Sequence, residues 1–192
     1  MSGRRRPVDP GDRDAGDWGG VIILGEAPVN RVNPVIEGGL LDGYFGGNDP
    51  DDDSGEFYYC RIEFPGHRIV EGNEVNGLTM GGVGRGTEIH HVQVSYSNDD
   101  SYEWFGGNQG NEAGRGDNGN YLVVLGGLDD VFDCDYGHTG DHQFGFARLD
   151  DRRRVPGRAA QDRAQPRQQF LHPERLGEIV VGAGVDALDA LA

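Results

Sequence analysis

Two segments of this chain match each other thirty residues apart, and the match predicts the fold. Asn98-Asp99-Asp100-Ser101-Tyr102-Glu103-Trp104-Phe105-Gly106-Gly107 aligns with Leu128-Asp129-Asp130-Val131-Phe132-Asp133-Cys134-Asp135-Tyr136-Gly137. Both segments carry two consecutive acids, then an alternating strand pattern, then a terminal glycine. Self-similarity at a fixed period of this length is typical of repeat architectures.

A second set of short segments follows the same period. Residues 60–64, 90–94 and 120–124 align at steps of thirty and form two apolar columns, Ile62-Val92-Leu122 and Phe64-Val94-Val124. Short alternating strands that repeat in register can coil into a solenoid whose turns stack at about 4.7–4.9 Å. We therefore expect an all-β chain folded as a right-handed parallel β-helix with few turns and irregular termini.

Composition sets the domain limits. Glycine makes up 34 of the 192 residues, well above the usual share of about 7%, which indicates many turns. The strand pattern occupies residues 17–149, which we assign to the β-helix domain. Residues 1–16 are polar and are predicted to be disordered or non-native. Residues 150–192 are predicted to be an irregular Arg-rich tail, either disordered or a gene-model artefact, with one short helix possible near its end.

The charge is strongly negative and unevenly distributed. The net charge is −16, and residues 17–149 alone hold 23 acids and 6 arginines, a net of −17. An acidic core argues against a nucleic-acid partner, because phosphate binding needs clustered cations. No apolar run approaches the length of a membrane span, which predicts no transmembrane segment. No apolar stretch follows the basic residues of the N-terminus, so no signal peptide is visible. The two cysteines, Cys60 and Cys134, are expected to be buried free thiols.

The period also places acids on acids. In this register Asp99 lies near Asp129, Asp100 near Asp130 and Glu103 near Asp133. Carboxylates stacked at the strand spacing repel each other, so one of them is protonated or a cation lies between them. Ca²⁺ prefers six to eight such oxygen ligands. The alternative is that these acids are solvated residues that cap the corners of the solenoid.

A second candidate calcium site is an acidic loop. Asp49, Asp51 and Asp53 have the 1, 3, 5 spacing of a calcium loop. Ser54 stands where an EF-hand requires glycine and Cys60 where it requires glutamate, so the loop is not an EF-hand. A looser calcium loop and a plain solvent-exposed loop both remain open.

Several motifs resemble a family of exported bacterial surface proteins and lipoproteins that look like right-handed, pectate-lyase-like β-helices. These motifs are Trp18-Gly19-Gly20, residues 44–50, Arg61-Ile62-Glu63-Phe64, Asn76-Gly77-Leu78-Thr79, residues 92–101, Glu103-Trp104-Phe105-Gly106-Gly107 and Leu128-Asp129-Asp130. The resemblance covers about two thirds of the chain. It implies the fold and an exported location, at the cell surface or outside the cell, and implies no activity.

A hydrolase is the alternative function. Pectin-hydrolysing glycosidases on β-helices use clustered aspartates, a Gly-His-Gly segment and an Arg-x-Lys segment. The partial counterpart here is Asp99, Asp100, Asp129, Asp130 and His138. One carboxylic acid would protonate the leaving oxygen and another would activate water. The chain has no lysine, so the Arg-x-Lys segment has no counterpart.

The histidines and exposed aromatics are weaker candidates. His138 and His142 are four residues apart, but that spacing needs a helix to bring both rings to one metal, so we expect ordinary hydrogen-bonded histidines. His90 and His91 are expected to point to opposite faces of a strand. Phe105 and Tyr121 face outward in the alternation, where an aromatic ring can stack on a glycan; interior packing at an imperfect register is the favoured alternative.

Taken together, the sequence favours a non-catalytic exported scaffold or adhesion protein, stabilised by calcium, with a glycan or another surface protein as partner. A polysaccharide-active enzyme is one alternative. Another is a self-associating fragment of a larger surface protein, because a solenoid with few turns exposes its ends.

Overall fold

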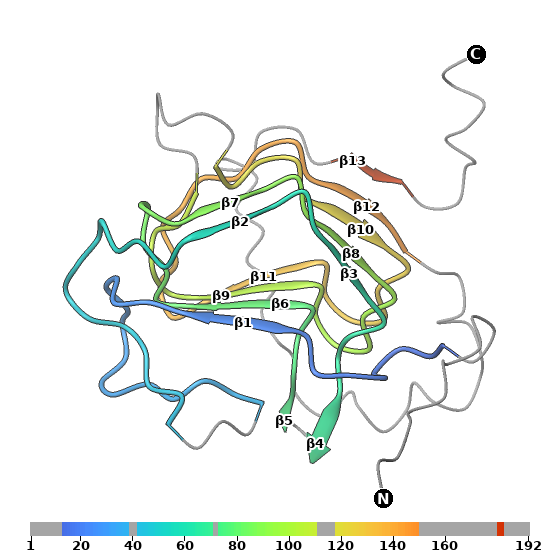
Figure 1. Ribbon diagram of the computed structural model, residues 1–192, viewed down its shortest axis with the longest axis horizontal. Coiled ribbons are helices and arrows are strands. Elements are labelled where there is room, and N and C mark those ends of the chain that lie inside the picture. The colour runs from blue at the N-terminus through green and yellow to red at the C-terminus, as the bar shows by residue number, and fades with distance from the viewer. Residues whose placement is uncertain (1–12, 39–41, 71–72, 111–117, 150–179, 183–192) are drawn as a thin grey trace, which may run out of the picture.

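The computed structural model describes residues 13–38, 42–70, 73–110, 118–149 and 180–182. In this part of the chain the regular secondary structure is entirely β, and most strands pair in parallel. Three walls of short strands surround a common interior, so that the chain passes from one wall to the next in each turn (Figure 1). The fold is thus the parallel β-helix that the repeat predicts.

The strands divide among the walls as follows. Wall A has the order β1 (Val21–Leu24), β6 (Leu78–Gly81), β9 (Tyr102–Phe105), β11 (Phe132–Asp135). Wall B contains β2 (Glu56–Tyr58) and β7 (Glu88–His90), and the bridge between Asn120 and Gln143 pairs two later turns in parallel. Wall C has the order β3 (Arg61–Glu63), β8 (Gln93–Ser95), β10 (Val123–Leu125), β12 (Phe146–Arg148), β13 (Val180–Gly182). An antiparallel hairpin of β4 (Arg68–Val70) and β5 (Asn73–Glu74) projects from the solenoid (Figure 1).

The register confirms the match that opened the sequence analysis. Tyr102 pairs with Phe132 and Glu103 with Asp133, a step of thirty residues from β9 to β11. The predicted column through Ile62 is wrong by two residues, because Ile62 pairs with Val94 rather than Val92. The step from β3 to β8 is 32 residues (from 61 to 93), since the excursion through the hairpin lengthens that turn.

The interior is an apolar column that includes buried aromatic rings. Alternation turns Tyr102 and Trp104 inward, where both are buried. Tyr102 stacks on Phe132 with ring centroids 5.3 Å apart. Val94 and Val124 of wall C meet these rings from the other side of the core. Burial of each large side chain contributes roughly 1.5–3 kcal/mol.

The segment between β1 and β2 covers the outer face of wall A. Ile36 and Phe45 from this segment pack on Phe105 in a second apolar cluster. Phe105 faces outward as predicted but is only 6% exposed, so it is not a free surface for a glycan. Glu37, which lies in the same segment, is placed beside the polar residues of this wall.

Residues with a positive φ turn many corners of the solenoid. At the corner between walls B and C such a residue is bulky in four successive turns, with φ values of 51°, 51°, 57° and 57° at Tyr59, His91, Tyr121 and Phe144. Their rings stack with centroids 4.7, 4.5 and 4.9 Å apart. We call these four residues the aromatic ladder. A left-handed conformation costs a non-glycine residue about 1–2 kcal/mol, so the ladder combines backbone strain with ring contact.

Two further predictions about inward positions are wrong. Phe64 does not join the apolar column, because it turns the corner after β3 with a φ of 59° and stacks on Tyr96 at 5.0 Å. Neither cysteine is a buried thiol, because Cys60 is half-buried and Cys134, on the edge strand β11, is exposed.

The predicted tail contains one described strand. Residues 180–182 form β13, which pairs in parallel with β12. The predicted helix near the end, in residues 183–192, lies outside the described residues, as do residues 150–179. The domain limits at residues 16 and 149 therefore stay predictions.

Candidate metal centre

Wall A places polar residues in two rows on its outer side. Thr79, Glu103 and Asp133 occupy the same outward position of β6, β9 and β11. Asn76, Asp100 and Asp130 each lie two residues before the start of those strands. Because the turns stack in register, every residue of one row lies one strand spacing from its neighbour. The repeat alone therefore concentrates oxygen atoms at this edge of the wall.

Five carboxylates form what we call the acidic cluster. Carboxylate oxygens of Asp99, Asp100 and Asp129 lie within 4.8 Å of one another, and those of Asp100, Glu103 and Asp133 do so as well. Asp100 belongs to both groups and is fully buried, whereas Asp129 is exposed. The structure thus brings together five of the six acids that the repeat predicts.

Asp100 is the electrostatic centre of the acidic cluster. Its burial raises the pKa of its carboxyl to about 9, with further contributions from Asp99 and Asp129. The backbone N–H of Asp130 donates to its Oδ1 at 3.0 Å. Without a bound cation, Asp100 is therefore protonated at neutral pH, because burial and like charges both disfavour the carboxylate.

Glu103, which lies three residues further along the chain on β9, is in a similar environment. Burial raises the pKa of its carboxyl well above the ordinary value, and the Glu37 carboxyl, with which it shares a hydrogen bond, adds to the rise. Asn76 Nδ2 donates to Oε2 of Glu103 and, at 2.8 Å, to Oε1 of Glu37. Glu103 therefore ties the solenoid to the segment that covers it.

Two buried neutral oxygens lie beside these acids. Oδ1 of Asn76 and Oγ1 of Thr79 have no hydrogen-bond partner among the described residues. The two side chains are 0% and 1% exposed, so water does not replace the missing partner at the surface. An unsatisfied buried polar atom costs about 1–3 kcal/mol. A cation held by Asp100, Glu103 and Asp133 would be within reach of ligands of the type that Ca²⁺ prefers.

The sixth predicted acid plays a different part. Asp130 belongs to neither carboxylate group, but its backbone N–H donates to Asp100 and its charge adds to the raised pKa of Asp100.

The acidic loop does not gather its carboxylates. Asp49 Oδ1 accepts from the N–H of Asp51 at 2.9 Å, and Asp53 Oδ1 accepts from that of Gly55 at 2.9 Å. The Asp51 carboxylate lies 2.5 Å from Nε of Arg85. Each side chain caps its own turn or pairs separately, so the 1, 3, 5 spacing does not produce a common site among the described residues.

The hydrolase set is not assembled. His138 lies beyond the far end of β11 from Asp129 and Asp130. Its Nδ1 contacts the carbonyl oxygen of Gly106 at 2.9 Å, and its ring packs near Trp104 in the interior. The structure therefore does not place this imidazole beside the clustered aspartates, as an acid–base role in the predicted set would require.

The two predictions about histidine pairs have different outcomes. His138 and His142 are hydrogen-bonded as predicted, but the premise that a helix is needed to bring their rings together is wrong, because Nε2 of His138 faces Nε2 of His142 at 2.9 Å although no helix joins them. Nδ1 of His90 lies 2.9 Å from Nδ1 of His91. The left-handed φ of His91 breaks the alternation of the strand, and both rings consequently turn to the same side.

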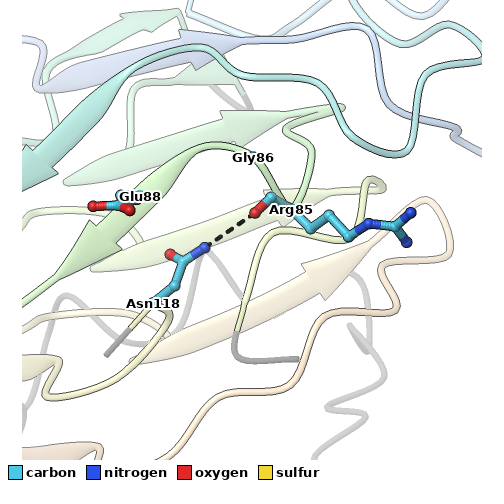
Figure 2. A pocket seen from close by; sticks show the side chains of 4 residues that line it. All are labelled: Arg85, Gly86, Glu88 and Asn118. Atoms are coloured by element: carbon cyan, nitrogen blue, oxygen red, sulfur yellow. Dashed lines mark hydrogen bonds between the residues drawn. The ribbon is translucent and has the colours of Figure 1, made fainter. Parts of the chain in front are cut away.

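A small pocket lies elsewhere, beside wall B. It is lined by Arg85, Gly86, Glu88 and Asn118. Figure 2 shows Asn118 Nδ2 directed at the carbonyl oxygen of Arg85, at 3.4 Å, with the guanidinium pointing away from it. The pocket contains none of the predicted site residues.

Sequence reasoning missed Asn76, Thr79 and Glu37. A signal for the first two exists, because Asn76-Gly77-Leu78-Thr79 aligns with Asp100-Ser101-Tyr102-Glu103 at a step of 24 residues. A search restricted to steps of thirty does not find it. Glu37 has no such signal, since it comes from a long connection outside the repeat.

These features define a parallel β-helix protein with a polar, acid-rich outer wall. Comparison of the sequence with known families identifies the relationship more closely: the model of the pectate-lyase like beta helix domain matches residues 9–181. The chain belongs to this family. Neither a curated protein nor a solved structure gives a significant match. Within the described residues, no helix has the length and apolar character needed to cross a membrane.

Proposed function

We propose that this protein is a non-catalytic, exported β-helical scaffold that binds Ca²⁺ at its acidic cluster. The observation that carries the proposal is the arrangement of Asp100, Glu103 and Asp133 beside the unsatisfied oxygens of Asn76 and Thr79. A hard cation there would replace protons on the carboxyls and supply the missing partner of both neutral oxygens.

The place of the cluster supports a structural role for the ion. Glu103 is bonded through Asn76 to Glu37, in the segment that covers wall A. A cation on this side of Glu103 would hold three turns together and fix the covering segment on them. The proposed export follows from the resemblance of the sequence motifs, and extracellular calcium would then keep the site filled.

Thermal unfolding with calcium and with EDTA tests the metal. At a calcium concentration of about 100 times Kd, binding adds about 2.7 kcal/mol, which for a chain of this size raises Tm by roughly 5–10 °C. Glu103→Gln and Asp100→Asn should each remove most of this rise. Asp53→Asn, which changes an acid outside the cluster, should preserve it. An equal Tm in calcium and EDTA for the parent protein would eliminate the calcium site.

A polysaccharide-active enzyme is the second candidate. The family description and the exposed Asp129 beside Asp99 and Asp100 favour it, because a substrate can reach an exposed carboxylate. Incubation with acidic and neutral glycans, followed by assay of reducing ends and unsaturated products, tests this function. Activity that is lost in Asp129→Asn and Asp130→Asn but kept in Asp53→Asn would replace the scaffold proposal.

A further inference from the structure

We propose that His138 and His142 form a two-coordinate site for a soft monovalent cation, Cu(I) or its analogue Ag(I), inside the solenoid. The site is separate from the acidic cluster and does not depend on calcium binding. The two residues lie on the short segment after β11, and their rings pack against Trp104 at centroid distances of 5.5 and 4.4 Å.

The hydrogen bonds fix which nitrogen of each ring carries the proton. Nδ1 of His138 lies 2.9 Å from the carbonyl oxygen of Gly106, and Nδ1 of His142 lies 3.2 Å from that of Gly119. A carbonyl oxygen only accepts, so each Nδ1 must carry the hydrogen. In a neutral imidazole the other nitrogen then presents a lone pair.

The two lone pairs converge. Nε2 of His138 and Nε2 of His142 are 2.9 Å apart. The ring centroids are 5.2 Å apart with an interplanar angle of 16°. The centroid distance exceeds the distance between the two Nε2 atoms by about two ring radii. Both nitrogens therefore lie close to the line between the ring centres. Burial lowers the pKa of His138 to about 4 and that of His142 to about 3, which leaves both rings neutral at pH 7.

The two neutral rings lack one hydrogen for the contacts that they make. Two N–H···O bonds and one N–H···N bond need three hydrogens, whereas two neutral imidazoles carry two. A cation between the Nε2 atoms resolves the opposition of the lone pairs. Imidazoles that bind metals almost always donate their other N–H to a carbonyl or carboxylate, which both rings do here.

The ligand number selects the kind of cation. Zn²⁺ takes four ligands in structural sites, and no group of three or more metal-binding side chains among the described residues includes either histidine. Cu(I) and Ag(I), with filled d shells, accept two nitrogen ligands in a line. The adjacent indole of Trp104 adds the attraction of an aromatic face for a cation.

The backbone packs closely around the pair. A Cβ at Gly140 would lie 1.9 Å from the carbonyl oxygen of Gln109 and 2.8 Å from Nε2 of His138, so only glycine fits beside the nitrogen. Metal–nitrogen bonds of about 2 Å require the two Nε2 atoms to move apart on binding. We expect that movement to change the environment of Trp104.

Silver titration of the whole chain tests the site. Cys60→Ser and Cys134→Ser remove competing thiols, and Trp18→Phe leaves Trp104 as the only tryptophan, which can be excited selectively. One equivalent of Ag(I) should change Trp104 emission, and His138→Gln or His142→Gln should weaken binding more than about 100-fold, beyond the loss expected for an outer-shell partner. His67→Gln is the matched control, because Nδ1 of His67 also faces a carbonyl oxygen, that of Gly16 at 3.1 Å. The His67→Gln variant should bind silver with the affinity of the parent protein.

A second measurement covers variants that do not fold. In ¹⁵N spectra of the folded parent, Ag(I) should shift the Nε2 resonances of two histidines, and Trp104 should show the accompanying change. The proposal is overturned if silver binds with the same affinity in both variants, or if it shifts other histidines. It is also overturned if silver has no effect while acidification from pH 7 to 5 stabilises the protein, which would mean that the pair shares a proton instead.

Discussion

The acidic cluster and the aromatic ladder both arise from the stacking of successive turns in register, but the stacked side chains repel each other in the cluster and attract each other in the ladder. In each, the register places similar side chains one above another in successive turns. Stacked rings attract, with about 0.5–1.5 kcal/mol for each pair, so the ladder offsets strain in its own backbone. Stacked carboxylates repel, so the cluster needs protons or a cation. A repeat therefore stabilises or destabilises itself according to the side chain that it copies.

The largest expected effect is a pH dependence of stability that the acidic cluster causes and the aromatic ladder does not. The pKa of Asp100 is about 9 in the folded protein and near 3.9 when unfolded, so the folded state holds an extra proton between these values. In EDTA, stability should fall as pH rises from 7 to 8, by up to about 1.4 kcal/mol per pH unit for Asp100. Below this window the unfolded state binds protons at His138 and His142 that the folded state does not, which opposes the slope, whereas above pH 7 both histidines are largely neutral in both states.

Urea unfolding across this range, with and without calcium, provides the measurement. Calcium should reduce the loss, because it stabilises the carboxylate that higher pH favours. Asp100→Asn cannot ionise and should have a shallower slope that retains only the contribution of Glu103, whereas Tyr121→Phe, a change within the ladder, should retain the full slope. A parent protein whose stability is flat from pH 7 to 8 in EDTA would show that Asp100 is not protonated.

An intermediate effect concerns strain in the ladder. Tyr121→Ala removes contacts with His91 and Phe144 and keeps a side chain at positive φ, so we expect a loss of about 2 kcal/mol. Tyr121→Gly loses the same contacts but relieves about 1 kcal/mol of strain. Glycine should therefore be the more stable variant, against the usual order in strands. Denaturant unfolding of both variants decides the order, and an equal or more stable alanine variant would contradict the strain.

The smallest effect tests how specific the ladder is. His91→Phe keeps a flat ring between Tyr59 and Tyr121, so its free energy of unfolding should stay within about 0.5 kcal/mol of the parent. His91→Leu, of similar bulk without a flat ring, serves as the comparison and should be less stable. If both variants unfold alike, ring stacking does not stabilise this corner.

The sequence predicted the part of the fold in which turns have equal length. Between β9 and β11 the step is thirty residues, so Glu103 and Asp133 could be paired correctly from the pattern. The first turns contain a hairpin and a long covering segment, which shifted the column through Ile62. Turn length is set by loops that face solvent, and no periodic constraint on the core reveals it.

The sequence pattern predicted the acids of the site but not the neutral side chains beside them or the glutamate that contacts them from the covering segment. Asp99, Asp100 and Asp129 follow from the repeat, whereas Glu37 reaches Glu103 only because a connection folds back over wall A. The His138–His142 pair was discounted because a spacing of four was linked to a helix. The irregular segment after β11 brings the same two nitrogens together, which spacing alone does not indicate.

The long reach of β1 has a consequence for how the molecule assembles. Val21 pairs with Leu78, 57 positions later, whereas β9 and β11 pair across thirty. Closing a larger loop costs more chain entropy, although the cost grows slowly with length. Because β1 also has a neighbour on only one side among the described strands, growth of the solenoid should start among the later turns and end with β1. The first residues of the domain to leave a ribosome would then be among the last to find their place.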